Sequence, residues 1–237
     1  MAFNLLFGIW TAVLAVIGTP LLLLPAGATW ALARLWIGGG FAMLAILIGL
    51  RHRVVGRERQ PAGPAIYAAK HQSAWDTLAL SVLLDRPAFV LKQELLKVPF
   101  FGWYLRKCGM IPVDRQGKAT ALKRMLKAAE RAAGDGRPIL IFPEGTRVSP
   151  GERRPFQPGV VALYAHLGLP VVPVALNSGL FWGRRSFRKR AGTITVQFLT
   201  PMDPGMARKP FIAALEDGIE QASQQLALGE AAVSDFG

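Results

Sequence analysis

Two long apolar runs occupy the first fifty residues and restrict the possible fold more than any other feature of the chain. Residues 3–24 and residues 30–50 are each long enough to cross a hydrocarbon core of about 30 Å as a helix. Residues 25–27, with the sequence Pro-Ala-Gly, favour a turn between them, and Arg34 is the one charged residue in the two runs. Residues 1–50 are therefore predicted to form a membrane helical hairpin. The hairpin either spans the bilayer or enters one leaflet, because hydrophobic length does not set depth.

Positive charge follows the second apolar run, whereas the first run and the turn carry no lysine or arginine. The basic side chains directly after the run are Arg51, His52, Arg53, Arg57 and Arg59. This bias places the following domain on the cytoplasmic side of the inner membrane. A cleaved signal peptide is the competing interpretation, because residues 26–28 fit a small-residue cleavage site. The second apolar run and the absence of a basic opening segment argue against it.

Strand-like and helix-like segments alternate in the rest of the chain, which predicts the α/β class. We assign residues 51–64 to a basic linker rich in proline and glycine, and residues 65–237 to one α/β domain with an acidic C-terminal tail. Short apolar runs of strand type lie at 65–69, 88–92, 138–142, 171–176 and 193–198. An amphipathic helix is indicated by the spacing of Leu122, Met125, Leu126 and Ala129. We expect a mixed, largely parallel sheet covered by helices, and a surface helix with a frayed end in the tail.

A histidine and a carboxylate lie close together where the first predicted strand of the domain meets a helix. The strand ends near Ala69, and the next residues include His71, Ser73 and Asp76. If Ser73 caps the helix, Asp76 lies in its first turn and the His71 ring can fold back toward the carboxylate. Such a pair is suited to general base catalysis. The competing interpretation is that Ser73 and Asp76 only form a capping box, with His71 a polar residue at the helix entrance.

Three further blocks end predicted strands in charged or turn-forming residues. They are the sequences Ile-Pro-Val-Asp-Arg ending at Arg115, Phe-Pro-Glu-Gly-Thr-Arg at 142–147, and Val-Pro-Val at 172–174. Together with the H-x4-D block at His71 and Asp76, they make the chain resemble the glycerophospholipid acyltransferase family, and within it the bacterial 1-acylglycerol-3-phosphate acyltransferases. The four blocks follow the order of the family, after an apolar N-terminal helix pair. The resemblance covers nearly the whole chain after the hairpin.

The resemblance implies transfer of an acyl group from acyl-CoA or acyl carrier protein to the hydroxyl of a membrane lipid, 1-acylglycerol 3-phosphate, giving phosphatidic acid. It implies no metal, no other cofactor and no acyl-enzyme. By the same resemblance His71 is the base, Asp76 orients it, and the acceptor and its phosphate are contacted by Arg115, Glu144, Gly145, Thr146 and Arg147. Local ion pairs of Asp114 with Arg115 and of Glu144 with Arg147 are the structural alternative. Another acceptor, such as a lyso-ornithine lipid or glycerol 3-phosphate, and a non-catalytic lipid-binding protein are the rival functions.

A net charge of +13 leads us to expect an anionic partner. Much of it lies in one cluster that interleaves basic and aromatic residues: Phe181, Trp182, Arg184, Arg185, Phe187, Arg188, Lys189 and Arg190. Nucleic acid suits such a cluster, but beside a membrane hairpin we favour an anionic membrane surface, and an acidic carrier protein is a further partner. We expect no nucleic acid partner.

The remaining reactive side chains have weaker claims to a catalytic role. Cys108 is the only cysteine, which excludes an intrachain disulfide and a cysteine-rich metal site. Its neighbours in the sequence include no histidine or acid, so it is a poor candidate nucleophile. His52 belongs to the basic segment after the hairpin, and His166 lies in a predicted helix with no carboxylate nearby in the sequence.

Overall fold

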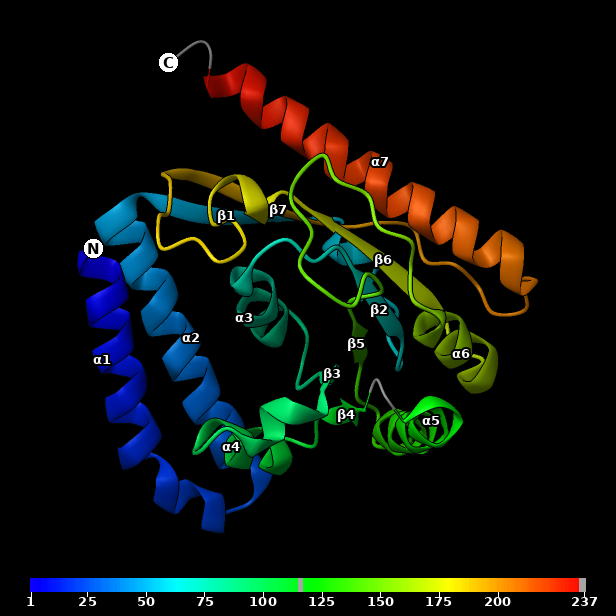
Figure 1. The fold of residues 1–237 in the computed structure, drawn as a ribbon, viewed down its shortest axis with the longest axis horizontal. Helices are drawn as coiled ribbons and strands as arrows, with labels where there is room; N and C mark the ends of the chain where they lie inside the picture. Colours follow the sequence, from blue (N-terminus) through cyan, green and yellow to red (C-terminus); the bar gives the residue numbers. More distant parts are fainter. Residues whose placement is uncertain (115–116, 235–237) are drawn as a thin grey trace.

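The computed structural model describes residues 1–114 and 117–234, and within them a single sheet of seven strands forms the centre of the molecule (Figure 1). The strands are ordered β1-β7-β6-β2-β5-β3-β4. Strands β2 to β6 run parallel to one another, β7 is antiparallel to β6, and β1 is parallel to β7. The bounds are β1 Leu50–Val55, β2 Ile66–Ala69, β3 Ala88–Lys92, β4 Ile111–Val113, β5 Ile139–Ile141, β6 Val171–Leu176 and β7 Gly192–Phe198. The predicted α/β class with a mixed, largely parallel sheet is confirmed.

Helices cover both faces of this sheet. They are α1 Ala2–Ile17, α2 Ala26–Ile48, α3 Ala74–Leu83, α4 Phe101–Lys107, α5 Lys118–Gly134, α6 Pro158–Leu167 and α7 Arg208–Ser234. Four short 3-10 turns accompany them: η1 Thr19–Leu23, η2 Arg57–Arg59, η3 Gln93–Lys97 and η4 Ser178–Leu180. Tyr67 and Ala69 of β2 belong to the core on the side of α1, α2 and α3, whereas Ile66 and Ala68 belong to the core beneath α5, α6 and α7. This alternation is the period of two expected for a strand buried on both faces.

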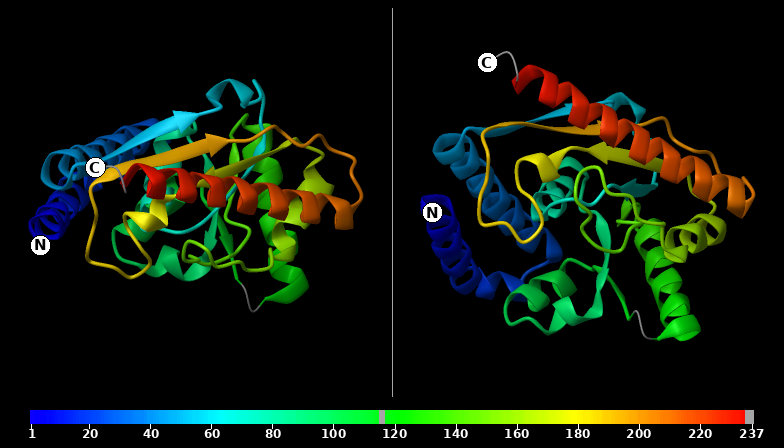
Figure 2. Two further views of the ribbon diagram at one scale, coloured as in Figure 1. Left: turned by 90° about the horizontal axis from the view of Figure 1, so that it is seen from above. Right: turned by 45° about the horizontal axis from the view of Figure 1, so that its top comes forward.

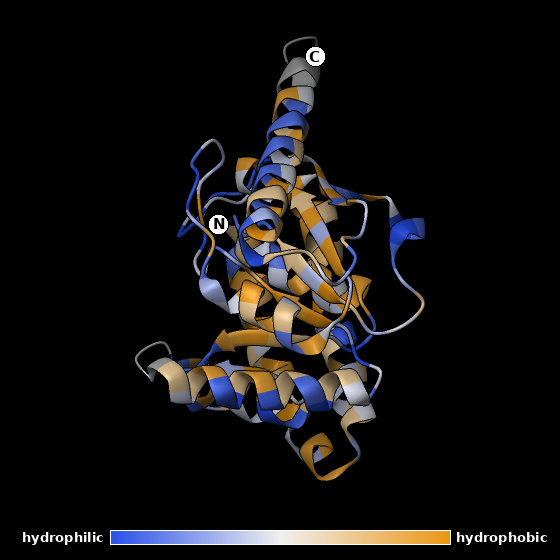
Figure 3. Cartoon of the chain, turned by 90° about the vertical axis from the view of Figure 1, so that its right-hand side faces the viewer, coloured by the Kyte–Doolittle hydropathy of each residue, from blue (hydrophilic) through white to orange (hydrophobic). Residues whose placement is uncertain are grey.

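Helix α5 confirms the predicted amphipathic helix. Figure 3 has α5 in the foreground and shows apolar and hydrophilic residues alternating along it. Met125 and Ala129 are buried against the sheet, while Leu122 lies at the edge of the buried stripe and is partly exposed. The helix therefore covers its face of the sheet with a narrow apolar stripe and leaves Lys123, Arg124, Lys127 and Arg131 in solvent.

The N-terminal hairpin is present, but its two arms differ in length. Helices α1 and α2 lie side by side (Figure 1), and the Trp36 Nε1 group donates a hydrogen bond to Thr11 Oγ1 at 2.9 Å between them. Helix α2 has 23 residues and is the one helix in the described part that is long and apolar enough to cross a membrane. Helix α1 has 16 residues and is followed by η1, so the apolar run at residues 3–24 is not one continuous helix. Gly18 and Pro20 end α1, because glycine lowers helix propensity and proline disfavours helical backbone in the residue before it.

The first residues of the segment assigned to a linker, 51–55, belong to the sheet, so the connection to the domain is shorter than predicted. Helix α2 ends at Gly49, whose positive φ of 74° turns the chain, and β1 begins at the next residue. Strand β1 pairs with β7 along its whole length, from Leu50 opposite Gly192 to Val55 opposite Gln197. It is an edge strand with mostly exposed side chains. Edge strands carry charged side chains readily, which is why a basic segment forms one here.

The C-terminal helix is a core element as well as a surface helix. Figure 2 shows α7 extended across the sheet. Phe211, Leu215 and Ile219 on α7 are fully buried beside α5 and α6. Helix α7 continues to Ser234, and the last residues of the tail, for which we predict a frayed end, lie outside the described residues. Helix α7 therefore closes one face of the fold and can bring a side chain toward the edge of the sheet where the loops meet.

Candidate active site

Three loops meet at one edge of the sheet because β2 lies between β5 and β6 and all three strands are parallel. The carboxyl ends of parallel strands share an edge, which is where α/β proteins place their functional groups. The backbone N–H of Val148, after β5, donates to the carbonyl of His71 at 2.8 Å. The backbone N–H of Gly179, after β6, donates to Gln72 Oε1 at 3.0 Å. Segments far apart in the sequence are thereby fixed around the loop that carries His71.

The predicted capping box begins helix α3. Ser73 is the N-cap residue with extended backbone, and its hydroxyl accepts a hydrogen bond from the N–H of Trp75 at 3.2 Å. Asp76 Oδ2 accepts from the N–H groups of Ser73 at 2.8 Å and Gln72 at 2.7 Å. These bonds satisfy backbone donors that a helix start would otherwise leave unpaired. The cap also holds the Asp76 carboxylate beside the loop that carries His71.

His71 makes the predicted contact with Asp76. The distance from His71 Nδ1 to Asp76 Oδ2 is 3.0 Å, and the His71 ring is stacked on Phe142 with ring centroids 4.0 Å apart. The Asp76 side chain is fully buried, whereas the His71 side chain is 14% exposed. A carboxylate at Nδ1 favours the tautomer that carries the proton there, which leaves Nε2 as the acceptor. The pair therefore has the geometry of an oriented base and is more than a helix cap.

Ser178 provides a further hydrogen bond to the Asp76 carboxylate, and the sequence does not indicate this contact. The Ser178 hydroxyl donates to Asp76 Oδ1 at 2.5 Å, and both residues are completely buried. Ser178 opens η4, directly after β6 and 102 positions from Asp76 in the sequence. Both oxygens of the carboxylate are thus held, Oδ2 by the cap and His71 and Oδ1 by Ser178. This arrangement restricts rotation of the carboxylate and so fixes the plane of the His71 ring.

A buried ion-pair network lies directly beneath this loop. Lys70 Nζ is 2.6 Å from Glu144 Oε1 and 2.6 Å from Glu220 Oε1, and all three residues are buried. Glu144 Oε2 also accepts a hydrogen bond from the backbone N–H of His71 at 2.8 Å. Burial raises the pKa of Glu144 to about 7, against the opposing effect of Lys70. The network joins the loops after β2 and β5 to helix α7.

This network corrects one expectation about Glu144. The alternative of a local Glu144 and Arg147 ion pair is wrong, because the carboxylate pairs with Lys70. The Glu144 side chain is buried and its oxygens bind Lys70 and the His71 backbone, so it supports the His71 loop, and its expected contact with an acceptor stays a prediction. Neither Lys70 nor Glu220 was singled out from the sequence. Lys70 is adjacent to His71, but Glu220 lies 150 positions from Lys70 and only the fold brings it there.

The other residues expected to contact the acceptor lie in the turn after β5. Gly145 has a positive φ of 68°, which favours glycine, and its N–H donates to the carbonyl of Phe142 at 2.9 Å. Thr146 and Arg147 follow and are half-buried. In residues 1–114 and 117–234, no carboxylate pairs with the Arg147 guanidinium, so the group is available to an anion. Arg115 lies outside the described residues.

The remaining candidate side chains are engaged elsewhere. Burial raises the pKa of the Cys108 thiol to about 11, which opposes a nucleophilic role. His166 has a carboxylate partner that is distant in the sequence: its Nε2 lies 2.7 Å from Glu130 Oε1 on the surface between α6 and α5. His52 packs against the rings of Phe41 and Trp75, and burial lowers its pKa. Across the described ranges, no group of three or more histidine, cysteine or acidic side chains could hold a metal ion.

Known proteins share both the sequence and the fold of this chain. A 1-acyl-sn-glycerol-3-phosphate acyltransferase from Pseudomonas aeruginosa is 40% identical over 161 residues, which cover 68% of this chain and 63% of the relative. The human 1-acyl-sn-glycerol-3-phosphate acyltransferase beta is 32% identical over 177 residues, covering 73% and 64%. The chain thus spans just under two thirds of the length of these two curated relatives.

The fold has a solved counterpart. The crystal structure of the 1-acyl-sn-glycerophosphate (LPA) acyltransferase PlsC from Thermotoga maritima superposes with a TM-score of 0.77 at 21% identity, covering 95% of both chains. The family model described as Acyltransferase matches residues 51–177. That stretch begins in β1 and ends after β6, so it contains the His71 loop, Asp76 and the turn with Glu144. It is also more than half of the sequence, and the chain therefore belongs to the acyltransferase family.

Proposed function

We propose that this protein transfers a fatty acyl group from an acyl thioester to the free hydroxyl of 1-acylglycerol 3-phosphate, giving phosphatidic acid. The observation that carries the proposal is the contact of His71 Nδ1 with Asp76 Oδ2 at 3.0 Å. This contact leaves Nε2 of a partly exposed ring to accept a proton. The names of the relatives in Pseudomonas aeruginosa and human support this acceptor. Acyl-CoA or acyl carrier protein supplies the thioester.

The reaction needs one base and no covalent enzyme intermediate. His71 Nε2 removes the proton of the acceptor hydroxyl while that oxygen attacks the thioester carbonyl carbon. Asp76 stabilises the imidazolium that forms, because its carboxylate remains at Nδ1. The tetrahedral intermediate collapses with cleavage of the carbon–sulfur bond, and the departing thiolate takes the proton from His71. The products are the ester and a free thiol, and the histidine is neutral again.

Purified full-length protein with a labelled acyl donor tests the proposal directly. Labelled acyl-CoA and labelled acyl carrier protein are supplied in parallel, each with 1-acylglycerol 3-phosphate, a lyso-ornithine lipid or glycerol 3-phosphate. We expect label in phosphatidic acid, from at least one donor, and little in the other products. Preferential labelling of another acceptor would replace the proposed substrate, and the absence of transfer to any of them would overturn the activity.

Arg147 is proposed to bind the acceptor phosphate, together with Arg115. A charge-assisted hydrogen bond to phosphate contributes about 1.5 to 3 kcal/mol, so Arg147→Ala should lower kcat/KM roughly ten- to a hundredfold. Arg147→Lys should recover only part of the loss, because it keeps the charge without the planar guanidinium. Steady-state kinetics with varied acceptor measure both effects. If Arg147→Ala raises the KM for the acceptor and leaves kcat unchanged, the arginine stabilises the bound substrate and the transition state equally.

An acceptor without phosphate is the control for Arg147. Wild type and Arg147→Ala should be similarly poor with monoacylglycerol, because the interaction removed by the substitution is never made with it. If Arg147→Ala loses the same factor on both acceptors, the side chain has a structural role and the phosphate assignment is wrong.

We further propose that the hairpin places the enzyme at the inner membrane with its catalytic domain on the cytoplasmic side. The outer face of α1 exposes apolar side chains, with Leu5 66%, Ile9 52% and Val16 61% exposed. A row of exposed apolar side chains of this extent marks a membrane or protein contact. The basic residues that follow α2 support the cytoplasmic side.

Replacement of Leu5, Ile9 and Val16 by glutamine should therefore reduce co-sedimentation with lipid vesicles at least tenfold, through loss of apolar burial. The same variant should keep its activity on a short-chain soluble acceptor. Deletion of the hairpin is a poorer test, because Phe3 and Leu44 belong to the core. Unchanged vesicle binding by the triple variant would show that this face of α1 does not enter the membrane.

A further inference from the structure

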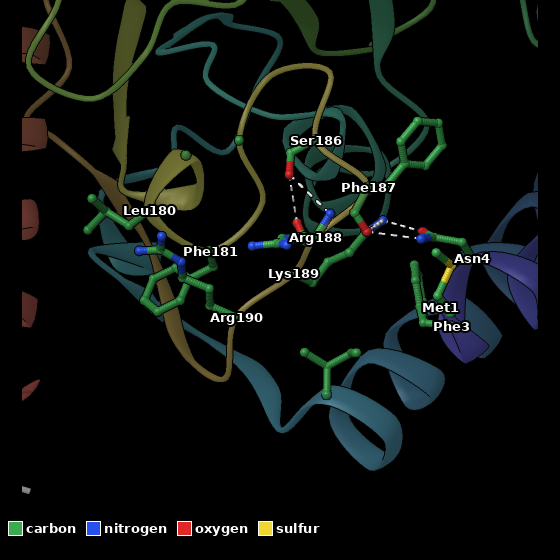
Figure 4. Close-up of a pocket in the computed structure, with 13 residues that line it drawn as sticks. Met1, Phe3, Asn4, Leu180, Phe181, Ser186, Phe187, Arg188, Lys189 and Arg190 are labelled. Carbon is green, nitrogen blue, oxygen red and sulfur yellow. Dashed lines mark hydrogen bonds between the residues drawn. The ribbon is translucent and has the colours of Figure 1, made fainter.

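A pocket of about 760 Å³ lies between the first turn of α1 and the loop that joins η4 to β7 (Figure 4). Its apolar lining includes Met1 and Phe3 from α1, with Leu180 and Phe181 from η4 and its C-cap. Its charged lining comes from the loop, which carries Arg188, Lys189 and Arg190. The pocket thus combines an apolar wall with a cationic wall, which is the pattern of a site for an amphiphilic anion.

The loop has a defined shape because it is bound to α1 and to η4. Asn4 Nδ2 donates to the carbonyl of Phe187 at 2.9 Å, and the N–H of Arg190 donates to the carbonyl of Phe181 at 2.9 Å. Lys189 Nζ donates to Asn4 Oδ1 and lies 4.3 Å from the ring centroid of Trp182. The charge of Lys189 is therefore used to fasten the loop to the hairpin.

Arg188 and Arg190 differ from Lys189. Both are exposed, both line the pocket, and no carboxylate in the described parts of the chain pairs with either guanidinium. In Figure 4 their side chains extend to the same side of the loop, whereas Lys189 turns toward Asn4. Two unpaired guanidinium groups on one wall are suited to a phosphate, because each offers paired N–H donors.

We propose that this pocket binds the headgroup of a diacyl anionic phospholipid of the surrounding membrane, with Arg188 and Arg190 at its phosphate. The inference rests on the proposed membrane location. Phe3 and Met1 of the pocket lead directly into the exposed apolar face of α1, which begins at Leu5. Acyl chains extending from a phosphate in the pocket would therefore pack along α1. A soluble anion such as CoA makes no use of that apolar face, which is why we assign the pocket to a membrane lipid.

The loop offers a matched control for this assignment. Arg184 and Arg185 lie in the same loop and are exposed, but they do not line the pocket. The variants Arg188→Ala/Arg190→Ala and Arg184→Ala/Arg185→Ala remove the same charge from the same segment. Diffuse attraction to an anionic surface, worth about 1 kcal/mol for each basic residue, should fall equally in both. If the headgroup binds at a discrete site, the additional loss of vesicle binding should occur only in the Arg188→Ala/Arg190→Ala variant.

Binding of full-length protein to vesicles measures the difference without any acyl donor. We expect the Arg188→Ala/Arg190→Ala variant to bind vesicles of phosphatidylcholine with phosphatidylglycerol at least tenfold more weakly than the Arg184→Ala/Arg185→Ala variant does. Both should bind pure phosphatidylcholine alike. Equal losses on the mixed vesicles would overturn the pocket and leave only a diffuse surface contact.

A photoactivatable phosphatidylglycerol identifies the occupant. It should crosslink to peptides containing residues 181–190, and excess phosphatidylglycerol should prevent the crosslink. If CoA or 1-acylglycerol 3-phosphate prevents it more effectively, the pocket serves a substrate and the assignment is wrong. The vesicle and crosslinking experiments measure lipid binding alone. Their results can therefore be interpreted even if the proposed acyl transfer is not found.

Discussion

Replacement of His71 by alanine is expected to lower kcat/KM for acyl transfer by about a thousandfold or more, because it removes the proposed base that the Asp76 carboxylate orients. The fold should persist. The ring is partly exposed and its side-chain contacts are with Phe142 and Asp76, while the backbone of residue 71 keeps its bonds to Glu144 and Val148. Transfer of label from the acyl donor measures the rate, and circular dichroism confirms the helices.

Two companion variants separate the base from its support. Asp76→Asn retains an oxygen for the helix cap but no longer stabilises the imidazolium, so a severe loss of kcat is expected with α3 intact. Ser178→Ala removes one hydrogen bond from the Asp76 carboxylate, and a loss of roughly tenfold is expected from looser positioning. A folded His71→Ala protein with substantial turnover would disprove the mechanism, whatever the other variants do.

Replacement of Glu220 by alanine is expected to destabilise the fold by about 1.5 to 3 kcal/mol, since it removes one charge-assisted hydrogen bond of the buried Lys70, which keeps Glu144 as its counter-ion. Asp217 is the matched control on the same helix, because its ion pair with Arg153 is exposed and 3.9 Å long. Asp217→Ala should cost less than about 1 kcal/mol. Denaturant unfolding of the purified proteins in the same detergent measures both free energies. Similar small losses in the two variants would mean that the Lys70 network contributes little to stability.

The parts of the fold that could be predicted depend on neighbours in the sequence. The strands at 88–92 and 171–176 agree with β3 and β6 residue by residue, because strands between two helical layers are runs of mainly apolar residues. The contact of His71 with Asp76 could be predicted because one helix cap holds both within five positions. Strand β1 could not be predicted from the sequence, since an edge strand with basic side chains lacks the apolar pattern of a buried strand.

The support of the site could not be predicted because it depends on long-range contacts. Ser178 and Glu220 reach the loop of the base only after β6 is placed beside β2 and α7 is packed across the sheet. A single sequence does not show which of many serines and acids will be brought there. The sequence also does not indicate that Glu144 is buried. Its position in the Phe-Pro-Glu-Gly block suggests a ligand contact, whereas its carboxylate pairs with Lys70 beneath the loop.

The direct junction of α2 with β1 has a mechanical consequence. One residue, Gly49, separates the long apolar helix from a strand that is paired along its length with β7. The connection is one residue long, and α2 also contacts β1 and α3, so a change in the tilt of α2 is transmitted to the sheet. The direction of the helix therefore sets the direction of the sheet, and with it the side from which a substrate can approach His71.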